Sequence, residues 1–331
     1  MTEFTEINLI EIVGKIKEGD RRSLSRAITL AESTRKDHQR YSKKIIQQLI
    51  SNPKKSVKIG LTGTPGVGKS TFIETLGLQL IQKGKKVAVL AIDPSSSKTG
   101  GSILGDKTRM ELLSKEPNAF IRPSPNRGSL GGVAKRTREV ITLCEAAGYD
   151  IILVETVGVG QSETMVSEMT DVFCLLIAPA GGDELQGVKR GIMEMSDIIL
   201  INKADGELKA IARQTSAQYQ GALRLFRHRK YDPPNFPKVI CVSSLKSSGL
   251  TEAWITIDEL VSWRQKNGHF KTIRENQKIA SFKRELFNEF ENKITKSHDI
   301  LSEIKALEER IGENEITPEL AAAYLIKKIF I

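Results

Sequence analysis

The chain has 331 residues, of which 39% are hydrophobic and 27% charged, and its formal net charge is +10. This composition describes a soluble globular protein with a sizeable buried core. The lysines are spread along the whole chain and no aromatic residues alternate with a basic run, so we expect no nucleic-acid partner.

Neither a membrane segment nor a disulfide framework is expected. The longest unbroken apolar run, Val172–Ala178, is too short to span a bilayer. Cys144, Cys174 and Cys241 are isolated from one another and the chain has four histidines, which argues against disulfides and a structural zinc site. The acidic N-terminus has no signal character, so we expect a cytoplasmic protein.

Residues 1–52 are predicted to form an N-terminal helical extension. Ile7, Ile10, Val13 and Ile16 recur at a helical spacing, and similar apolar patterns continue to residue 51. Because each pattern gives an apolar face, these helices are expected to pack on the core.

Between residues 53 and 249, apolar strands alternate with helical or looped segments. These strands are apolar on both faces, which is typical of a parallel sheet covered by helices on each side. The pattern predicts a three-layer α/β fold with a predominantly parallel sheet. The expected strands are 57–62, 87–92, 151–154, 172–178, 198–201 and 239–242.

A glycine-rich loop follows the first of these strands and precedes a segment of helical period. It matches G-x-x-x-x-G-K-[ST], in which glycines let backbone N–H groups and a helix N-terminus face a phosphate. The alternative is a glycine-rich turn with a solvent-facing lysine. The strand before the loop and the helix after it favour the phosphate-binding motif over that alternative. The predicted nucleotide-binding residues here are Gly63, Thr64, Pro65, Gly66, Val67, Gly68, Lys69, Ser70 and Thr71.

Two of these residues have separate chemical roles. Lys69 is the expected mobile cation over the β and γ phosphates, and the Ser70 hydroxyl is an expected Mg²⁺ ligand. The motif therefore makes residues 53–249 a predicted P-loop domain.

The segment Asn202-Lys203-Ala204-Asp205 follows a later strand and reads N-K-x-D, which is the guanine-selecting motif of GTPases. The Asp205 carboxylate can accept hydrogen bonds from guanine N1–H and the exocyclic amine, whereas adenine would leave it unpaired. Alone the motif is weak and could be a surface loop, but its place after a strand supports guanine binding. Ser243, Ser244 and Leu245 end the next strand, where GTPases place backbone donors around the guanine carbonyl.

An apolar strand ending at Glu155 is followed by Gly158, giving an E-x-x-G variant of the D-x-x-G switch. We expect Glu155 to reach the metal directly or through water, and the Gly158 N–H to bond the γ phosphate. Val159 follows, where Ras-like GTPases have a water-orienting glutamine, so unaided hydrolysis is expected to be slow. Asp93 and Asp106 could be metal ligands or, equally, a cap and a turn residue.

Residues 250–331 are predicted to be a C-terminal helical region. Ile300, Ile304, Leu307 and Ile311 form a heptad-like seam, Gly312 ends that helix, and a new helix starts at Pro318. The seam could be internal packing or a contact with a second subunit, so a dimerisation arm is one of two open alternatives.

Four longer runs of sequence are more specific than any single nucleotide motif. They are 91–96 (A-I-D-P-S-S), 101–106 (G-S-I-L-G-D), 155–163 (E-T-V-G-V-G-Q-S-E) and 179–187 (P-A-G-G-D-E-L-Q-G). These runs resemble the MeaB/ArgK-like GTPases, which are G-protein chaperones of adenosylcobalamin-dependent methylmalonyl-CoA mutase. The resemblance extends from about residue 20 through the C-terminal helices.

This resemblance implies a homodimer, formed through C-terminal helices, that uses GTP binding and hydrolysis to gate cofactor loading and protection of the mutase. It implies catalytic roles for Lys69, Asp106, Glu155 and Gly158. The implied magnesium and water-positioning set is Ser70, Asp93, Asp106 and Glu155. The loop 178–189 is implied to be a further switch that senses the partner, with Asp183, Gln186 and Lys189 as candidates for coupling partner binding to hydrolysis.

Two other functions are weighed against this one. A GTPase that inserts nickel into hydrogenase or urease would carry metal on Cys/His clusters, and here the sulfurs are scattered. A transport-linked kinase would place phosphate on a protein rather than release it into solution.

Overall fold

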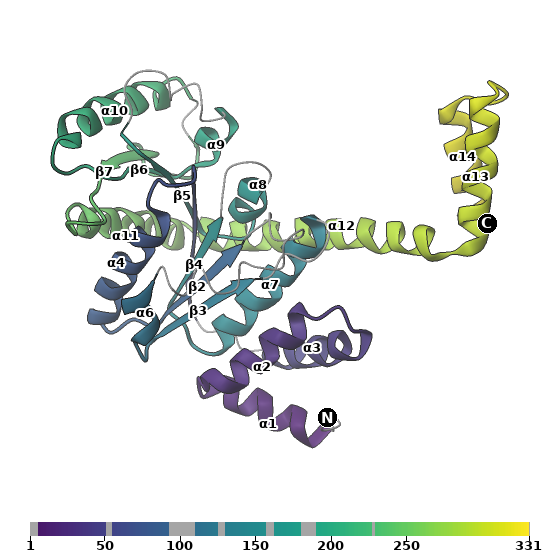
Figure 1. Ribbon diagram of the computed structural model, residues 1–331, viewed down its shortest axis with the longest axis horizontal. Helices are drawn as coiled ribbons and strands as arrows, with labels where there is room; N and C mark the ends of the chain where they lie inside the picture. The colour runs from purple at the N-terminus through teal and green to yellow at the C-terminus, as the bar shows by residue number, and fades with distance from the viewer. Residues whose placement is uncertain are drawn as a thin grey trace. The chain divides into compact units, whose positions relative to one another are not determined.

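A parallel sheet organises the larger of two units into which the chain divides, Met1–Glu275 and Asn276–Ile331 (Figure 1). The computed structural model describes residues 6–50, 55–92, 110–124, 130–156, 162–179, 190–226 and 229–330. Within these residues the sheet has seven strands in the order β3-β2-β4-β1-β5-β6-β7, and every pairing is parallel. The strands are β1 Val57–Gly63, β2 Val87–Ile92, β3 Ala119–Ser124, β4 Ile151–Thr156, β5 Val172–Ile177, β6 Ile198–Ile201 and β7 Lys238–Cys241.

The predicted parallel α/β fold is confirmed, and strand β3 is an addition to it. Arg122 and Pro123 interrupt the apolar pattern of β3, so the sequence of this segment does not predict a buried strand. Because β3 lies at the edge of the sheet, only one of its sides pairs with a neighbour, and an edge strand tolerates proline.

Helices cover both faces of this sheet, which gives the three layers. Successive residues of β2 alternate between the layers: Val87 and Val89 join one apolar cluster, whereas Ala88 and Leu90 join the other. The described helices of the larger unit are α1 Glu6–Lys17, α2 Arg21–Glu32, α3 Lys36–Leu49, α4 Lys69–Gln82, α6 Glu111–Lys115, α7 Leu130–Ala146, α8 Ser162–Ser167, α9 Arg190–Met195, α10 Leu208–Leu223 and α11 Leu250–Lys266. α4, α6 and α11 share the first cluster with the sheet, and α1, α2, α3, α7, α8, α9 and α10 share the second.

The N-terminal helices also make polar contacts beside the edge strand. Arg122 on β3 pairs with Glu32 on α2, and Arg21 at the start of α2 donates to the carbonyl of Glu116 just before β3. Asp20 caps α2 by accepting from the backbone N–H of Ser23 at 2.7 Å. These contacts tie α2 to β3 and to the segment that precedes it.

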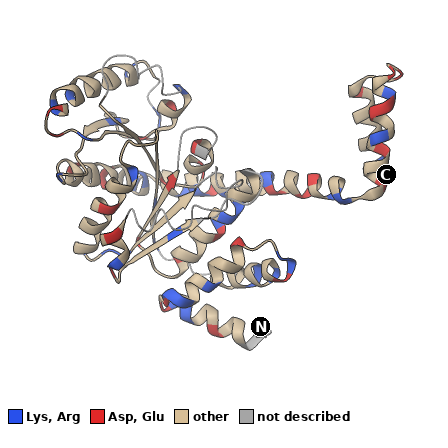
Figure 2. Cartoon of the chain, in the orientation of Figure 1, with Lys and Arg blue, Asp and Glu red and all other residues tan. Residues whose placement is uncertain are grey.

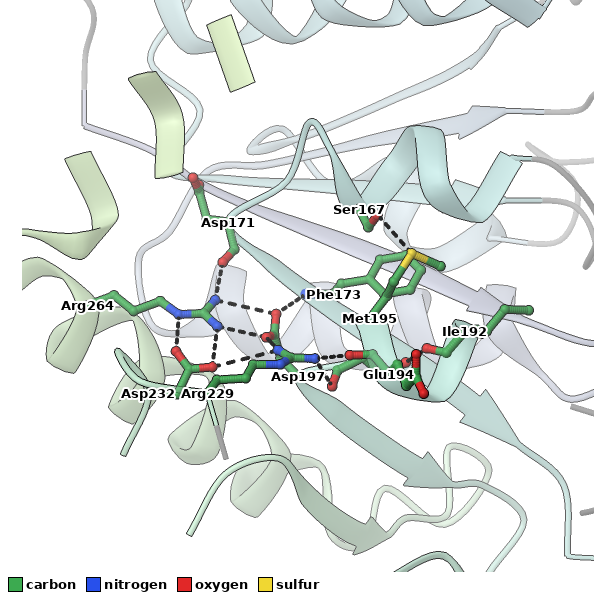
Figure 3. A network of polar contacts seen from close by, with 11 residues as sticks. Ser167, Asp171, Phe173, Ile192, Glu194, Met195, Asp197, Arg229, Asp232 and Arg264 are labelled. Atoms are coloured by element: carbon green, nitrogen blue, oxygen red, sulfur yellow. Dashed lines mark hydrogen bonds and ion pairs between the residues drawn. The ribbon is translucent and has the colours of Figure 1, made fainter. Parts of the chain in front are cut away.

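A buried ion-pair network lies at the amino ends of the strands (Figure 3). Arg264 on α11 donates to Asp197 at 2.7 Å and to Asp232 at 2.9 Å, and it also donates to the backbone carbonyl of Asp171 at 2.7 Å. Asp197 in turn accepts from the backbone N–H of Phe173 at 2.8 Å. Burial alone would raise the pKa of Asp197, but the charges of the neighbouring arginines outweigh burial and lower it.

The smaller unit is helical. It contains most of α12 (His269–Lys296), then α13 (His298–Gly312) and α14 (Pro318–Phe330), as the helical spacing of the sequence predicts. α13 and α14 pack against each other, Leu307 and Ala321 are buried, and Lys328 pairs with Glu303 at 2.7 Å. The division of the chain at residues 249 and 250 stays a prediction, and α11 packs into the same apolar cluster as the strands.

Basic and acidic side chains are interspersed along the helices of the described chain (Figure 2). None of the helices described here combines the length and the apolar character needed to cross a membrane.

Candidate functional site

The carboxyl ends of the parallel strands bring the predicted nucleotide motifs to one edge of the sheet. β1 lies at the centre, between β4 and β5, and leads directly into the glycine-rich loop. β4 ends at Thr156 beside it, and β6 and β7 lead into the segments that begin at Asn202 and Ser243. Parallel α/β sheets bind ligands outside the carboxyl ends of their strands.

The phosphate loop contains two positions that only glycine can occupy. A Cβ on Gly63 would lie 2.3 Å from the carbonyl oxygen of Leu176 on β5. Gly68 has a φ of 94° and is the N-cap residue just before α4, and a Cβ there would lie 2.7 Å from the Asn202 amide nitrogen. The loop therefore brings its backbone close to its neighbours and presents the N-terminus of a 14-residue helix.

Lys69 is buried and folded back over the loop. Its Nζ donates to the carbonyl of Gly63 at 2.7 Å and to that of Thr64 at 3.1 Å. The ammonium group is thus held at the mouth of the loop, where a phosphate would place its oxygens.

Ser70 and Glu155 meet although 85 residues separate them in the chain. The Ser70 hydroxyl donates to Glu155 Oε1 at 3.3 Å, and Glu155 is only 5% exposed. The next residue, Thr156, bonds through its hydroxyl to Thr62 at 2.9 Å, which joins β4 to β1 just before the loop. An alcohol and a carboxylate side by side are oxygen ligands of the kind that Mg²⁺ prefers.

The other predicted metal and switch residues lie outside the residues that the structure describes. These are Asp93, Asp106, Gly158, Asp183, Gln186 and Lys189.

Asn202 connects the phosphate loop to the loop after β7. Its amide nitrogen donates to the carbonyl of Val67 at 2.9 Å. Its amide oxygen accepts from both the backbone N–H and the hydroxyl of Ser244, at 3.1 and 2.8 Å. The first residue of the N-K-x-D motif therefore acts as a structural link between the two halves of the site.

Asp205 and Ser243 are also in contact. The Ser243 hydroxyl donates to the Asp205 carboxylate, and it accepts from the backbone N–H of Lys246 at 3.1 Å. Lys203 has a left-handed φ of 58° and an exposed side chain, and Leu245 is 77% exposed. The structure therefore brings the described residues of both predicted nucleotide motifs to one edge of the sheet.

Taken together, this geometry suits a nucleoside phosphate with a divalent cation. The glycine loop and Lys69 offer donors to phosphate oxygens, and Ser70 and Glu155 offer ligands to the cation. Asp205 offers an acceptor pair to a base that carries two neighbouring donors.

A contact of Thr75 with the Ser244 carbonyl, at 3.1 Å, is a feature of the site that the sequence did not indicate. A threonine in a helix is commonplace, and no local pattern marks one that reaches a distant loop.

Comparisons with known proteins agree with this geometry. The family described as "Methylmalonyl Co-A mutase-associated GTPase MeaB" matches residues 24–299. The chain is 44% identical to "GTPase ArgK" of Escherichia coli K12 over 294 residues, covering 89% of this chain and 88% of the relative. It is 44% identical over 322 residues to "Methylmalonic aciduria type A homolog, mitochondrial" of Mus musculus, covering 94% and 77% of the two chains. A crystal structure described as that of an "LAO/AO transport system kinase" covers all of both chains with 34% identity and a TM-score of 0.80.

Proposed function

The chain belongs to the family of methylmalonyl-CoA mutase-associated GTPases and is itself a P-loop GTPase, and we propose that it gates cofactor loading and protection of an adenosylcobalamin-dependent acyl-CoA mutase. In this proposal the GTP-bound form holds the mutase in one state and hydrolysis releases it. The observation that best supports nucleotide binding is the pair of hydrogen bonds from Asn202 to Val67 and Ser244, because it joins the phosphate loop to the proposed base loop. The proposal that a mutase is the partner is based on the family to which the chain belongs.

Mg²⁺ is proposed to bind at Ser70 and Glu155, with Asp93 and Asp106 completing the set of ligands. The contact between the Ser70 hydroxyl and the buried Glu155 carboxylate supports this assignment, since it places two oxygen ligands 3.3 Å apart next to the phosphate loop. When bound, the cation would neutralise charge on the β and γ phosphate oxygens. Lys69 would move from the carbonyls of its own loop to the phosphates, and Gly158 is proposed to bond the γ phosphate.

Guanine is the proposed base, read by Asp205. Ser243 supports this role because its hydroxyl donates to one oxygen of the Asp205 carboxylate, and the carboxylate has further lone pairs with which to accept from the base. Leu245 and its neighbours are proposed to face the guanine carbonyl.

Nucleotide selectivity tests this proposal directly. Asp205→Asn is expected to weaken the affinity for GTP about 100-fold, because two charge-assisted hydrogen bonds are lost. It should also favour binding of xanthosine triphosphate, whose C2 carbonyl can accept a hydrogen bond from the new amide. Asp258→Asn on the exposed face of α11 is the matched control and should leave both affinities unchanged. Unchanged GTP binding by Asp205→Asn would remove the guanine assignment.

Turnover and partner binding are tested separately. Lys69→Ala should abolish phosphate release, measured with GTP and Mg²⁺. A pull-down from the native extract should retain a mutase subunit to different extents with GTP and with GDP. Equal retention with both nucleotides would contradict a GTP-gated partner.

A homodimer is proposed through the smaller unit. Along α12, apolar side chains that are at least one-third exposed recur at helical spacing at Ile279, Phe282, Leu286 and Phe290. An apolar stripe of this length on one helix is typical of a helix that packs against another chain.

The two other functions considered from the sequence receive less support. Burial raises the pKa of the Cys144 and Cys174 thiols, which favours the neutral form over the thiolate that nickel or zinc would need. One related structure is described as a transport system kinase, and phosphate appearing on a protein rather than in solution would be the signature of that activity.

A further inference from the structure

The hydroxyl of Thr75 joins the helix after the phosphate loop to the loop after β7. It lies 2.8 Å from the carbonyl oxygen of Thr71, one turn earlier on α4, which is an ordinary contact for a helical threonine. It also lies 3.1 Å from the carbonyl oxygen of Ser244, 169 residues away in the chain. One hydroxyl proton is therefore shared between the helix and the loop.

The loop itself is held on its other sides. Ser243 and Ser248 close it through two backbone hydrogen bonds of 2.9 and 3.1 Å. The N–H and the hydroxyl of Ser244 both donate to Asn202, so the Ser244 carbonyl is held through Thr75 rather than through Asn202. Thr75 and Asn202 thus hold the same residue from two different elements.

The Ser244 carbonyl belongs to the peptide unit whose N–H is that of Leu245. This peptide bond is trans, so its C=O and N–H point in opposite directions. A contact that turns the carbonyl toward α4 must turn the Leu245 N–H away from α4. The direction of one backbone donor is therefore set by a side chain outside the N-K-x-D motif.

We propose that Thr75 is a positioning residue for base recognition, which orients the Ser244–Leu245 peptide so that the Leu245 N–H donates to the C6 carbonyl of guanine. The inference rests on the proposed function, because it takes the loop at 243–245 as the base loop. It adds a residue of α4, the helix that begins at the phosphate loop, to the groups that determine base selectivity.

A purely helical role for Thr75 is the alternative, and the chain offers a matched control for it. Thr142 on α7 makes the same kind of contact, 2.9 Å from the carbonyl of Arg138 one turn earlier, and is likewise half-buried. Thr75→Val and Thr142→Val each remove one hydroxyl while keeping the branched shape. Thr75→Ser restores the hydroxyl, and Thr75→Ala removes it in a second way if the valine variant does not fold.

The experiment compares the dissociation constants of GDP and of 2-aminopurine riboside 5′-diphosphate, which lacks the C6 carbonyl and, with it, the N1–H that faces Asp205. The effect of Thr75 is therefore read as the change that each variant makes in each constant. Thr75→Val or Thr75→Ala should weaken the affinity for GDP about threefold to tenfold and leave the affinity for the 2-aminopurine nucleotide unchanged. Thr75→Ser should keep the affinity for GDP of the unaltered chain. Thr142→Val should change neither constant.

Two results would overturn the inference: GDP affinity equal to the unaltered chain, or an equal loss for both nucleotides, which would indicate a structural role. Failure of the proposed function is distinguishable, because the unaltered chain would then not prefer GDP over the 2-aminopurine nucleotide at all.

Discussion

Replacing Arg264 by methionine should destabilise the larger unit strongly, because this arginine is buried between two aspartates. Figure 3 shows the contacts of the Arg264 side chain with those of Asp197 and Asp232. The Arg264 side chain is 5% exposed, and those of the two aspartates are similarly buried. Arg264→Met fills similar volume but leaves both carboxylates with Arg229 as the nearest remaining cation of the network. Removing one partner of a buried ion pair costs about 3–5 kcal/mol.

Thermal unfolding followed by circular dichroism measures this loss. At about 2 °C per kcal/mol for a unit of this size, we expect the midpoint to fall by about 6–10 °C at pH 7. Arg190→Met is the control, because Arg190 is 78% exposed and pairs with Glu194 one turn away on the same helix. Its midpoint should change by less than about 1 °C.

The loss should also depend on pH. The pKa of Asp197 is lowered in the folded protein, so its contribution to stability is present at neutral pH and is lost as the pH falls through that folded value. Without Arg264, burial should raise the pKa of Asp197, and protonation would then relieve the buried charge. The difference in midpoint between the two proteins should therefore narrow as the pH is lowered toward 4. A loss below about 1 kcal/mol, or one independent of pH, would refute this reasoning.

Three further variants test the site and the proposed dimer. Gly68→Ala should weaken the affinity for GDP at least about tenfold in calorimetric titration, because a Cβ at a φ of 94° is strained and displaces the Asn202 amide. An unchanged affinity would contradict the proposed loop geometry. Glu155→Gln should raise the Mg²⁺ concentration needed for half-maximal hydrolysis about tenfold to a hundredfold, whereas an unchanged Mg²⁺ dependence would remove Glu155 from the metal site. Phe282→Asp, at a side chain that is 66% exposed, should give monomers in sedimentation velocity if α12 forms the dimer contact, and a persisting dimer would place that contact elsewhere.

The local motifs were the part of the molecule that the sequence could predict. The glycine loop at Gly63–Thr71 and the segment at Asn202–Asp205 each lie within a few consecutive residues, and each follows a strand that is apolar on both faces. Because all the strands are parallel, predicting their ends also predicted that these motifs would share one edge of the sheet.

The long-range contacts could not be predicted in the same way. Asp171, Asp197, Asp232 and Arg264 are spread over 94 residues, and each alone is an ordinary charged residue of a soluble protein. Their partnership depends on the order in which the strands lie in the sheet, which no local pattern contains. The same reason hides the contact between Thr75 and Ser244.

Strand β3 shows a different limit. Its segment A-F-I-R-P-S has only three consecutive apolar residues, and proline is normally a sign against a strand. An edge position removes that objection, since one side of the strand needs no partner, and the Arg122 side chain reaches across to Glu32 on α2. The sheet has to be assembled before the edge can be recognised.

Asn202 lets the two tasks of the site be separated experimentally. Its amide contacts Val67 and Ser244, which belong to the phosphate and base loops and are needed by GTP and GDP alike. Asn202→Ala should therefore weaken the affinities for GTP and GDP by the same factor, about tenfold, because the same hydrogen bonds are lost in both complexes. Discrimination of GTP from GDP must come from groups near the γ phosphate, so Glu155→Gln with Mg²⁺ should change the ratio of the two affinities. If Asn202→Ala changed that ratio instead, the link between the loops would itself sense the γ phosphate, contrary to the division of roles proposed for this site.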